Sequence, residues 1–317
     1  MPNTWVRRGE LRWAAGAPAV LVALVCALAG CAPAVRAAEA SPDPRPVVLT
    51  TFTVLADMTR VVAGDHLRVE SLTKPGAEVH GYEPTPGDLR RAAGADLVLD
   101  NGLGLEAWFA QFIADADVPH VVLSEGIEPL PVATGAAEGQ ANPHAWMSPV
   151  LGQRYVATIA RALAELDPAH AADYARNAEA YRAELAAVHE ETTARLQAVP
   201  AGRRVLVTCE GAFSYLARDA GLDEEYVWAV NAEQQATPRQ VAAVIDAVEE
   251  RDVPAAFCES TVSAKPMERV VEATGARFGG TLYVDSLSGP EGPVPTYLDL
   301  LRHDTRVIAD ALTGRTP

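Results

Sequence analysis

The chain has 317 residues and a formal net charge of -16. So acidic a protein is not expected to bind nucleic acid, because its surface would repel phosphates. After the first thirty residues no apolar run is long enough to span a bilayer. Without a leader about 285 residues remain, enough for two lobes of ordinary domain size. We therefore expect a folded body outside the bilayer, with any anchor at its N-terminal end.

The first thirty residues have the pattern of an export signal. Three arginines precede an almost uninterrupted apolar run over 17–28, which is too short for a membrane span. The Leu-Ala-Gly-Cys sequence at 28–31 resembles the bacterial lipobox, in which the cysteine is acylated. We predict a lipoprotein signal peptide over 1–30, a lipid on Cys31, and an Ala- and Pro-rich tether over 31–45. The alternative is an ordinary signal peptide cut nearby, with the cysteine incidental.

Residues 46–166 alternate short β-rich runs with helical segments, the pattern of an N-terminal α/β lobe. Continuous apolar strands separated by helices indicate parallel strands covered on both faces. In chain order the expected strands are VVLTTF, LRVESL, DLVLD and HVVLS, and the expected helices are LADMTRVVAG, PGDLRRAAG and LEAWFAQFIADA.

The stretch over 167–200 is expected to form one long helix connecting two lobes. Asp167 and Pro168 suit its cap and first turn. A helix of about thirty residues spans about 45 Å, enough to run along both lobes and resist a wide hinge opening. Its apolar residues recur at three- and four-residue steps and mark a single stripe. They are Tyr174, Ala178, Tyr181, Leu185, Val188 and Leu196.

Residues 201–317 repeat the scheme and predict a C-terminal α/β lobe, with strands RRVLVTC, EYVWAV, PAAFC and TLYVD and a last helix near 296–312. The expected fold class is α/β, with a parallel sheet flanked by helices in each lobe. Cys209 and Cys258 each end a predicted strand and each precedes a glutamate. An oxidising compartment permits a disulfide between them, and two buried thiols are the alternative, because the sequence does not show their spacing.

Four side chains far apart in the chain carry donors suited to one divalent transition metal: His80, His144, Glu210 and Asp285. Two imidazoles and two carboxylates are a sufficient ligand set, and the two negative charges balance those of the ion. Glu210 and Asp285 lie at the ends of predicted strands. His80 lies in the loop after another strand, and His144 precedes a helix. Ligands of parallel sheets bind beyond the carboxyl ends of the strands, so the ion would lie in the cleft between the lobes.

Each of these side chains also has an ordinary structural role open to it. A lone loop histidine is usually solvated or hydrogen-bonded, and a carboxylate at a strand end is usually a cap. Glu210 could cap the helix that follows it, and Asp285 could cap a turn. We assign the ordinary role to the remaining histidines, which are His66, His120, His170, His189 and His303.

The sequence around the four donors resembles the metal-binding group of ABC-transporter solute-binding proteins. The resemblance rests on VHGYEPTPGDL, PHAWMSP, CEGAFSYLARDAGL, WAVNAEQQATPRQV, ESTVSAKPM and GTLYVDSLSGPEGPVPTYLDLL, which follow the family's order over most of 46–312. It implies two α/β lobes joined by one rigid helix, with the four donors as ligands. Where many relatives have Asp-Pro-His this chain has Asn142 in place of the aspartate, which puts the role of that aspartate in doubt.

The resemblance leaves the metal open among manganese, iron and zinc. Relatives that resemble dedicated zinc binders usually have a third histidine and often a histidine-rich loop. Here the third position is Glu210, and the loop over 131–141 contains no histidine. Oxygen ligands favour Mn²⁺, and two bidentate carboxylates would give it an N₂O₄ shell. We predict Mn²⁺ first, Fe²⁺ second and Zn²⁺ third, although zinc can bind tightly in vitro because affinity at most sites rises from Mn²⁺ to Zn²⁺.

The predicted function is that of an extracytoplasmic carrier rather than an enzyme. Four protein ligands leave little room for the open position that a catalytic metal needs. We expect a monomer, lipid-anchored to the bacterial cell membrane or periplasmic, that delivers its metal to an ABC-transporter permease. The alternatives are a metallohydrolase with Glu210 as the base, a thiol enzyme built on Cys209, and an adhesin or structural lipoprotein.

Overall fold

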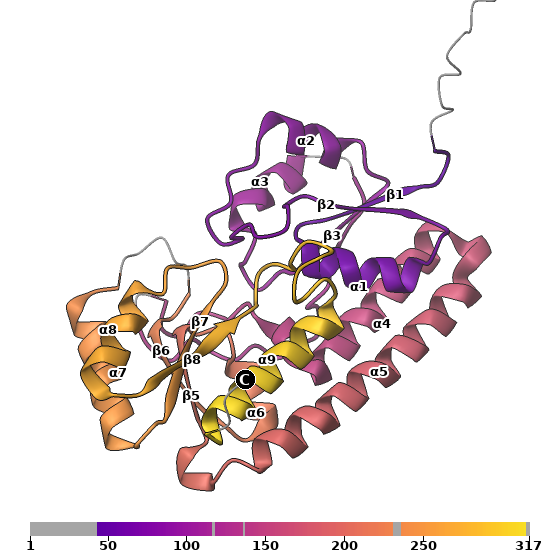
Figure 1. Cartoon of the computed structure of the whole chain (residues 1–317). Coiled ribbons are helices and arrows are strands. Elements are labelled where there is room, and N and C mark those ends of the chain that lie inside the picture. The colour runs from indigo at the N-terminus through magenta and orange to yellow at the C-terminus, as the bar shows by residue number, and fades with distance from the viewer. Residues whose placement is uncertain (1–42, 116–117, 136, 231–235, 315–317) are drawn as a thin grey trace, which may run out of the picture. The chain divides into compact units, whose positions relative to one another are not determined.

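The computed structural model describes residues 43–115, 118–135, 137–230 and 236–314 (Figure 1). The predicted signal peptide, the lipidation site Cys31 and most of the predicted tether lie outside these residues. The NAEQQ part of one family motif, at 231–235, also lies outside them. Within the described part, no helix combines the length and apolar character needed to cross a membrane.

The first half of the body is a parallel sheet with helices against it. Its elements are β1 (Val47–Thr50), α1 (Thr53–Ala63), β2 (Arg68–Ser71), α2 (Pro86–Ala93), β3 (Leu97–Asp100), α3 (Ala107–Asp115) and β4 (His120–Val122). The four strands run in the order β2-β1-β3-β4, and every neighbouring pair is parallel. Successive side chains of β1 point to opposite faces of the sheet and belong to different apolar clusters. Val48 packs with α1, whereas Leu49 packs with residues of α2 and α3. Both faces of the sheet are therefore covered.

The second half contains four more strands, but they form two separate pairs. The elements are β5 (Val205–Glu210), α6 (Ser214–Ala220), β6 (Asp223–Trp228), α7 (Pro238–Glu250), β7 (Ala255–Glu259), α8 (Lys265–Thr274), β8 (Arg277–Leu282) and α9 (Tyr297–Leu312). β5 pairs with β6, and β7 pairs with β8, both in parallel. β5 and β7 are buried along their whole length and lie next to each other, yet no backbone ladder joins them among the described residues.

A long helix connects the two halves. α4 (Pro149–Leu166) is followed by a 3₁₀ turn (Pro168–His170) and then by α5 (Ala171–Gln197), which contacts α1, α4, α6 and α9 (Figure 1). Its 27 residues span about 40 Å, and the predicted apolar stripe is buried. The predicted fold class, two parallel α/β lobes joined by a long helix, is confirmed. The lobe boundaries at 166/167 and 200/201 stay a proposal.

The end of β8 differs from the prediction. The sequence suggested a strand TLYVD reaching Asp285, whereas β8 begins at Arg277 and ends at Leu282. A bulge at Ala256/Phe257 shifts the register of its partner strand, and Gly280 has a φ of +136° that other residues rarely adopt. Asp285 therefore lies in the loop beyond the strand.

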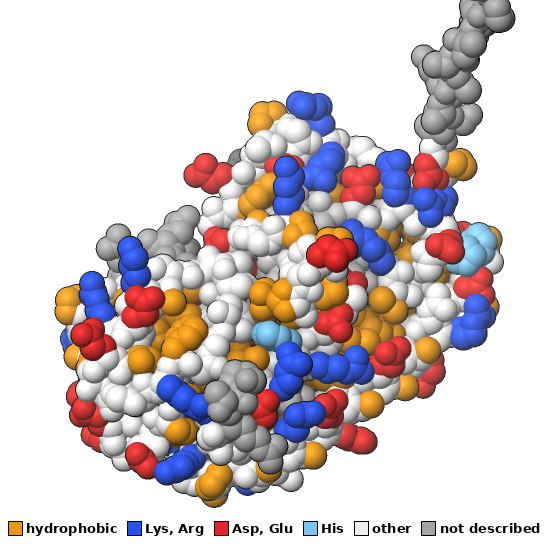
Figure 2. Space-filling view, viewed as in Figure 1, with side chains coloured by type: hydrophobic (Ala, Val, Ile, Leu, Met, Phe, Trp, Pro, Cys, Tyr) orange, Lys and Arg blue, Asp and Glu red, His pale blue; other side chains and the backbone are white. Residues whose placement is uncertain are grey.

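Acidic and basic side chains are interspersed over the face of the body seen in Figure 2. The negative balance of the chain is thus not concentrated in one patch on this face.

Candidate metal centre

The four predicted donors come from four separate segments that meet beyond the carboxyl ends of the strands. Glu210 is the last residue of β5, and Asp285 lies in the loop after β8. His80 lies in the loop between β2 and α2, and His144 directly precedes a 3₁₀ turn. Their side chains are at most 5% exposed. This placement agrees with the rule that parallel sheets bind ligands at this edge.

The donor atoms of these side chains face one another. His80 Nε2 lies 3.0 Å from His144 Nε2 and 3.2 Å from Glu210 Oε1. It also lies 3.9 Å from Asp285 Oδ1, and His144 Nε2 lies 3.7 Å from Glu210 Oε1. Two donors each about 2.1 Å from one ion lie about 3.0–3.5 Å apart at tetrahedral or octahedral angles. The observed spacing therefore suits a single ion with little movement of the ligands.

Asn142 orients His144. Its side-chain oxygen accepts a hydrogen bond from the His144 backbone N–H at 3.1 Å and lies 2.9 Å from His144 Nδ1. Its amide group donates to the Gly211 carbonyl at 2.7 Å, which fixes which end of the amide faces the ring. Nδ1 must then carry the proton, so Nε2 offers its lone pair to the centre. The asparagine thus supplies an acceptor at the position where many relatives have aspartate, a role that sequence reasoning left in doubt.

Glu78 holds the loop that carries His80, and sequence reasoning missed it. Its carboxylate accepts the backbone N–H groups of His80 at 2.6 Å and Gly81 at 2.9 Å. Trp108 Nε1 donates to the carbonyl of buried Val79 at 3.0 Å and anchors the same loop from α3. A glutamate two residues before a loop histidine is the only sequence signal that could have suggested this support.

Burial and charge act in opposite directions on the titrating groups. Burial alone would lower the pKa of His80, but Glu210 and then Asp285 outweigh it and raise that pKa to about 9. Burial lowers the pKa of His144 to about 3. Burial, reinforced by Glu210, raises the pKa of Asp285 to about 7. A protonated His80 thus supplies the positive charge that a metal ion would otherwise bring to these carboxylates.

Comparison with known proteins identifies the family. A family model described as zinc-uptake complex component A, periplasmic, matches residues 48–311. The chain belongs to this family. Its members are extracytoplasmic substrate-binding proteins of metal ABC importers, and they are transport proteins rather than enzymes.

Individual relatives are named for different metals. The chain is 52% identical over 263 residues to the iron-binding protein YfeA of Yersinia pestis, covering 83% of this chain and 85% of that protein. It is 30% identical over 304 residues to the manganese ABC transporter substrate-binding lipoprotein PsaA of Streptococcus anginosus, covering 93% and 97%. The Mn-bound periplasmic metal-binding protein of Candidatus Liberibacter asiaticus matches with a TM-score of 0.79 and 36% identity, over 84% of this chain and 100% of that one.

In this substrate-binding protein a small cavity leads to His80. The cavity measures about 240 Å³ and is lined mainly by apolar side chains, among them Leu103, Leu105, Val132 and Pro143. His80 is the one predicted donor that lines it. His80 is therefore the predicted donor that an ion in this cavity would contact.

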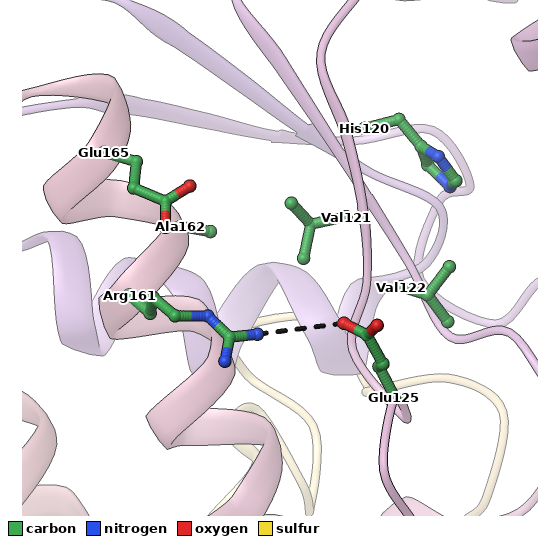
Figure 3. A pocket seen from close by; sticks show the side chains of 7 residues that line it. All are labelled: His120, Val121, Val122, Glu125, Arg161, Ala162 and Glu165. Carbon is green, nitrogen blue, oxygen red and sulfur yellow. Dashed lines mark ion pairs between the residues drawn. The ribbon is translucent and has the colours of Figure 1, made fainter.

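The remaining histidines of the substrate-binding protein lie elsewhere in the described body. Three of them pair with aspartates at 2.6–3.0 Å: His66 with Asp173, His120 with Asp100 and His170 with Asp167. His120 also lines a cavity of about 540 Å³, where Arg161 reaches to within 3.8 Å of Glu125 (Figure 3). Glu125 and Glu165, the two carboxylates that line this cavity, are exposed, whereas the donors of the centre are buried and face one another.

Cys209 and Cys258 form a disulfide, with Cα atoms 4.9 Å apart, within the usual range of about 4.4–6.8 Å. It joins the ends of β5 and β7 and closes a sequence separation of 49 residues. The same geometry leaves Cys209 without the free thiol that a thiol enzyme would need.

We expect Cys209→Ala/Cys258→Ala to lower the free energy of unfolding by about 2–4 kcal/mol, because the unfolded chain regains the entropy of an open loop. Thermal unfolding of the metal-free protein by calorimetry measures the loss. A dithiol reductant should lower the melting temperature of the original protein and leave that of the double variant unchanged. Equal stability of the two proteins under oxidising conditions would contradict the prediction.

Proposed function

We propose that this protein binds one divalent transition metal ion with His80, His144, Glu210 and Asp285 and delivers it to an ABC-transporter permease. The observation that supports this best is the convergence of four buried donors from separate segments, at spacings of 3.0–3.9 Å. Such a set has no role in holding the fold, because burying ionisable groups together is costly unless an ion or proton compensates.

Within this proposal, Mn²⁺ is the first cargo and Fe²⁺ the second. Two imidazoles and two carboxylates suit both ions, and a second oxygen from Glu210 would raise the coordination number toward their preferred six. The ranking rests on this donor chemistry, because relatives of the chain are named for iron, for manganese and for zinc. Zn²⁺ is third, because only two of the four ligands are nitrogen and none is sulfur.

The remaining parts of the proposal concern attachment and assembly. We propose that Cys31 carries a lipid and that residues 31–45 tether the body to the outer face of the cell membrane. The body would act as a monomer, with the metal passed directly to the permease. A metallohydrolase is disfavoured because Glu210 lies among the other three donors, within 3.2 Å of His80, where it acts as a ligand and not as a base.

Elemental analysis of the protein purified from its native cells tests the cargo. We expect one equivalent of metal per chain, with manganese ahead of iron, because the donor set favours ions that accept several oxygens. Titration of the metal-free protein with Mn²⁺, anaerobic Fe²⁺ and Zn²⁺ provides the intrinsic affinities. Zinc alone in the native preparation would overturn the ranking, and substoichiometric binding of all three ions would overturn the proposed function.

A further inference from the structure

One short segment contacts both carboxylate ligands. It is the carboxyl end of β7 and the two residues after it, Glu259 to Thr261, and we refer to it as the β7 bracket. Thr261 Oγ1 donates to Asp285 Oδ2 at 3.2 Å, and the backbone N–H of Glu210 donates to Glu259 Oε2 at 3.2 Å. We infer that Glu259 and Thr261 are positioning residues that fix the separation and orientation of the two carboxylate ligands. This inference rests on the proposed function.

Thr261 determines which oxygen of Asp285 faces the ion. Its hydroxyl donates a hydrogen bond to Asp285 Oδ2, whereas Asp285 Oδ1 is buried and has no hydrogen-bond partner among the described atoms. Oδ1 is also the oxygen that lies 3.9 Å from His80 Nε2. A hydroxyl bonded to one carboxylate oxygen stops rotation about the side chain and directs the other oxygen to the metal.

Glu259 fixes the backbone of Glu210. Its side chain is only 2% exposed, and its second oxygen, Oε1, is buried without a hydrogen-bond partner in the described part of the chain. Burying a carboxyl group with one oxygen unsatisfied costs free energy. We therefore expect the hydrogen bond that Glu259 accepts from the Glu210 backbone to contribute to the geometry of the site. A carboxyl oxygen accepts an N–H in either protonation state, and the positioning role does not depend on the charge of Glu259.

The bracket is needed because the two carboxylates belong to different strand pairs. Glu210 ends β5, which pairs with β6, whereas Asp285 follows β8, which pairs with β7. Within the described residues no ladder joins β5 to β7. Near the centre, the Cys209–Cys258 disulfide and the hydrogen bond of Glu259, the next residue, connect the two strand pairs. The spacing between the carboxylates therefore depends on the end of β7.

The decisive variant is Thr261→Val, which keeps the shape of the side chain and removes the hydroxyl. We expect it to weaken Mn²⁺ binding by about 10- to 100-fold, the usual effect of removing a hydrogen bond to a metal ligand. Calorimetric titration of the full chain measures the affinity. The electron paramagnetic resonance spectrum of the bound Mn²⁺ should also change, because it reports on the carboxylate geometry. The melting temperature of the metal-free protein should fall by only about 2–4 °C, the effect of losing one hydrogen bond worth about 1 kcal/mol.

Matched variants separate positioning from general destabilisation. Thr261→Ser keeps the hydroxyl and should bind within about threefold of the original protein, well inside the loss expected without it. Glu259→Gln keeps an acceptor oxygen and should bind more tightly than Glu259→Leu. Ser260 lies between the two residues with an exposed side chain, so Ser260→Ala serves as the control. If Glu259→Leu does not fold, the Thr261 pair decides the question.

Two results would overturn the inference. One is wild-type affinity and an unchanged spectrum for Thr261→Val, and the other is an equal loss in Ser260→Ala. Failure of the unaltered protein to bind Mn²⁺, Fe²⁺ or Zn²⁺ would instead overturn the proposed function. The two failures are therefore distinguishable in the same set of titrations.

Discussion

Asp285→Ala and His80→Ala are each expected to lower the affinity for Mn²⁺ by about 100- to 1000-fold. A structural Zn²⁺ site of four ligands has a binding free energy of about 10–16 kcal/mol, so one ligand accounts for roughly a quarter of it, which corresponds to this change in Kd. The fold should tolerate both changes. Burial raises the pKa of Asp285 to about 7, which shows that the metal-free protein gains little from holding this carboxylate charged.

Thermal unfolding with and without Mn²⁺ gives a direct readout of the loss. A ligand that binds only the folded state raises the melting temperature according to its affinity, so the shift should nearly vanish in both variants. His303→Ala is the matched control, because this half-exposed histidine bonds to the carbonyl of Thr281 outside the centre. Undiminished metal stabilisation in Asp285→Ala or His80→Ala would contradict the ligand assignment.

The architecture and the four donors could be predicted because both depend on local pattern. Continuous apolar runs such as that of β5 identify buried parallel strands, and the stripe on α5 identifies a helix packed along one side. Once the strands are placed, the residues at their carboxyl ends are candidate ligands by topology alone. Glu210 was selected as a candidate ligand in this way, and its Oε1 lies 3.2 Å from His80 Nε2.

The supporting contacts could not be predicted because they depend on packing between distant segments. The hydrogen bond from Asn142 to the Gly211 carbonyl spans 69 residues, and nothing near either residue in the chain indicates it. The same holds for the contact between Glu259 and Glu210. The missing ladder between β5 and β7 is a further example, since both strands have the apolar sequence of a continuous central sheet.

The prediction of where β8 ends was wrong for a related reason. The run TLYVD has strong β propensity, yet the ladder with β7 starts earlier, at the pairing of Ala255 with Arg277, and is finished at Leu282. Register with a partner strand decides where a strand stops, and the register is not encoded in the strand itself. The consequence for the site is small, because Asp285 still lies beyond the same sheet edge.

Metal affinity is expected to fall by about 100- to 1000-fold between pH 8 and pH 6, because protons compete with the ion for the same donors. The pKa of His80 is raised to about 9 by Glu210 and Asp285 against the effect of burial. The metal binds the deprotonated imidazole, so each unit of pH below this pKa costs about tenfold in affinity. Asp285, with a pKa near 7, adds to the loss at the acidic end of the range. His144, with a pKa of about 3, stays neutral throughout and contributes nothing.

Calorimetric titration of Mn²⁺ at pH 7, in two buffers with different ionisation enthalpies, measures the protons released. We expect about one proton from His80 and a fraction of one from Asp285. In Asp285→Asn, His80 loses one of the charges that raise its pKa, so the fall in affinity should begin at a lower pH. A constant Kd from pH 8 to pH 6.5 would show that the imidazole is already neutral in the metal-free protein. In that case no protonated histidine balances the two buried carboxylates before the ion arrives.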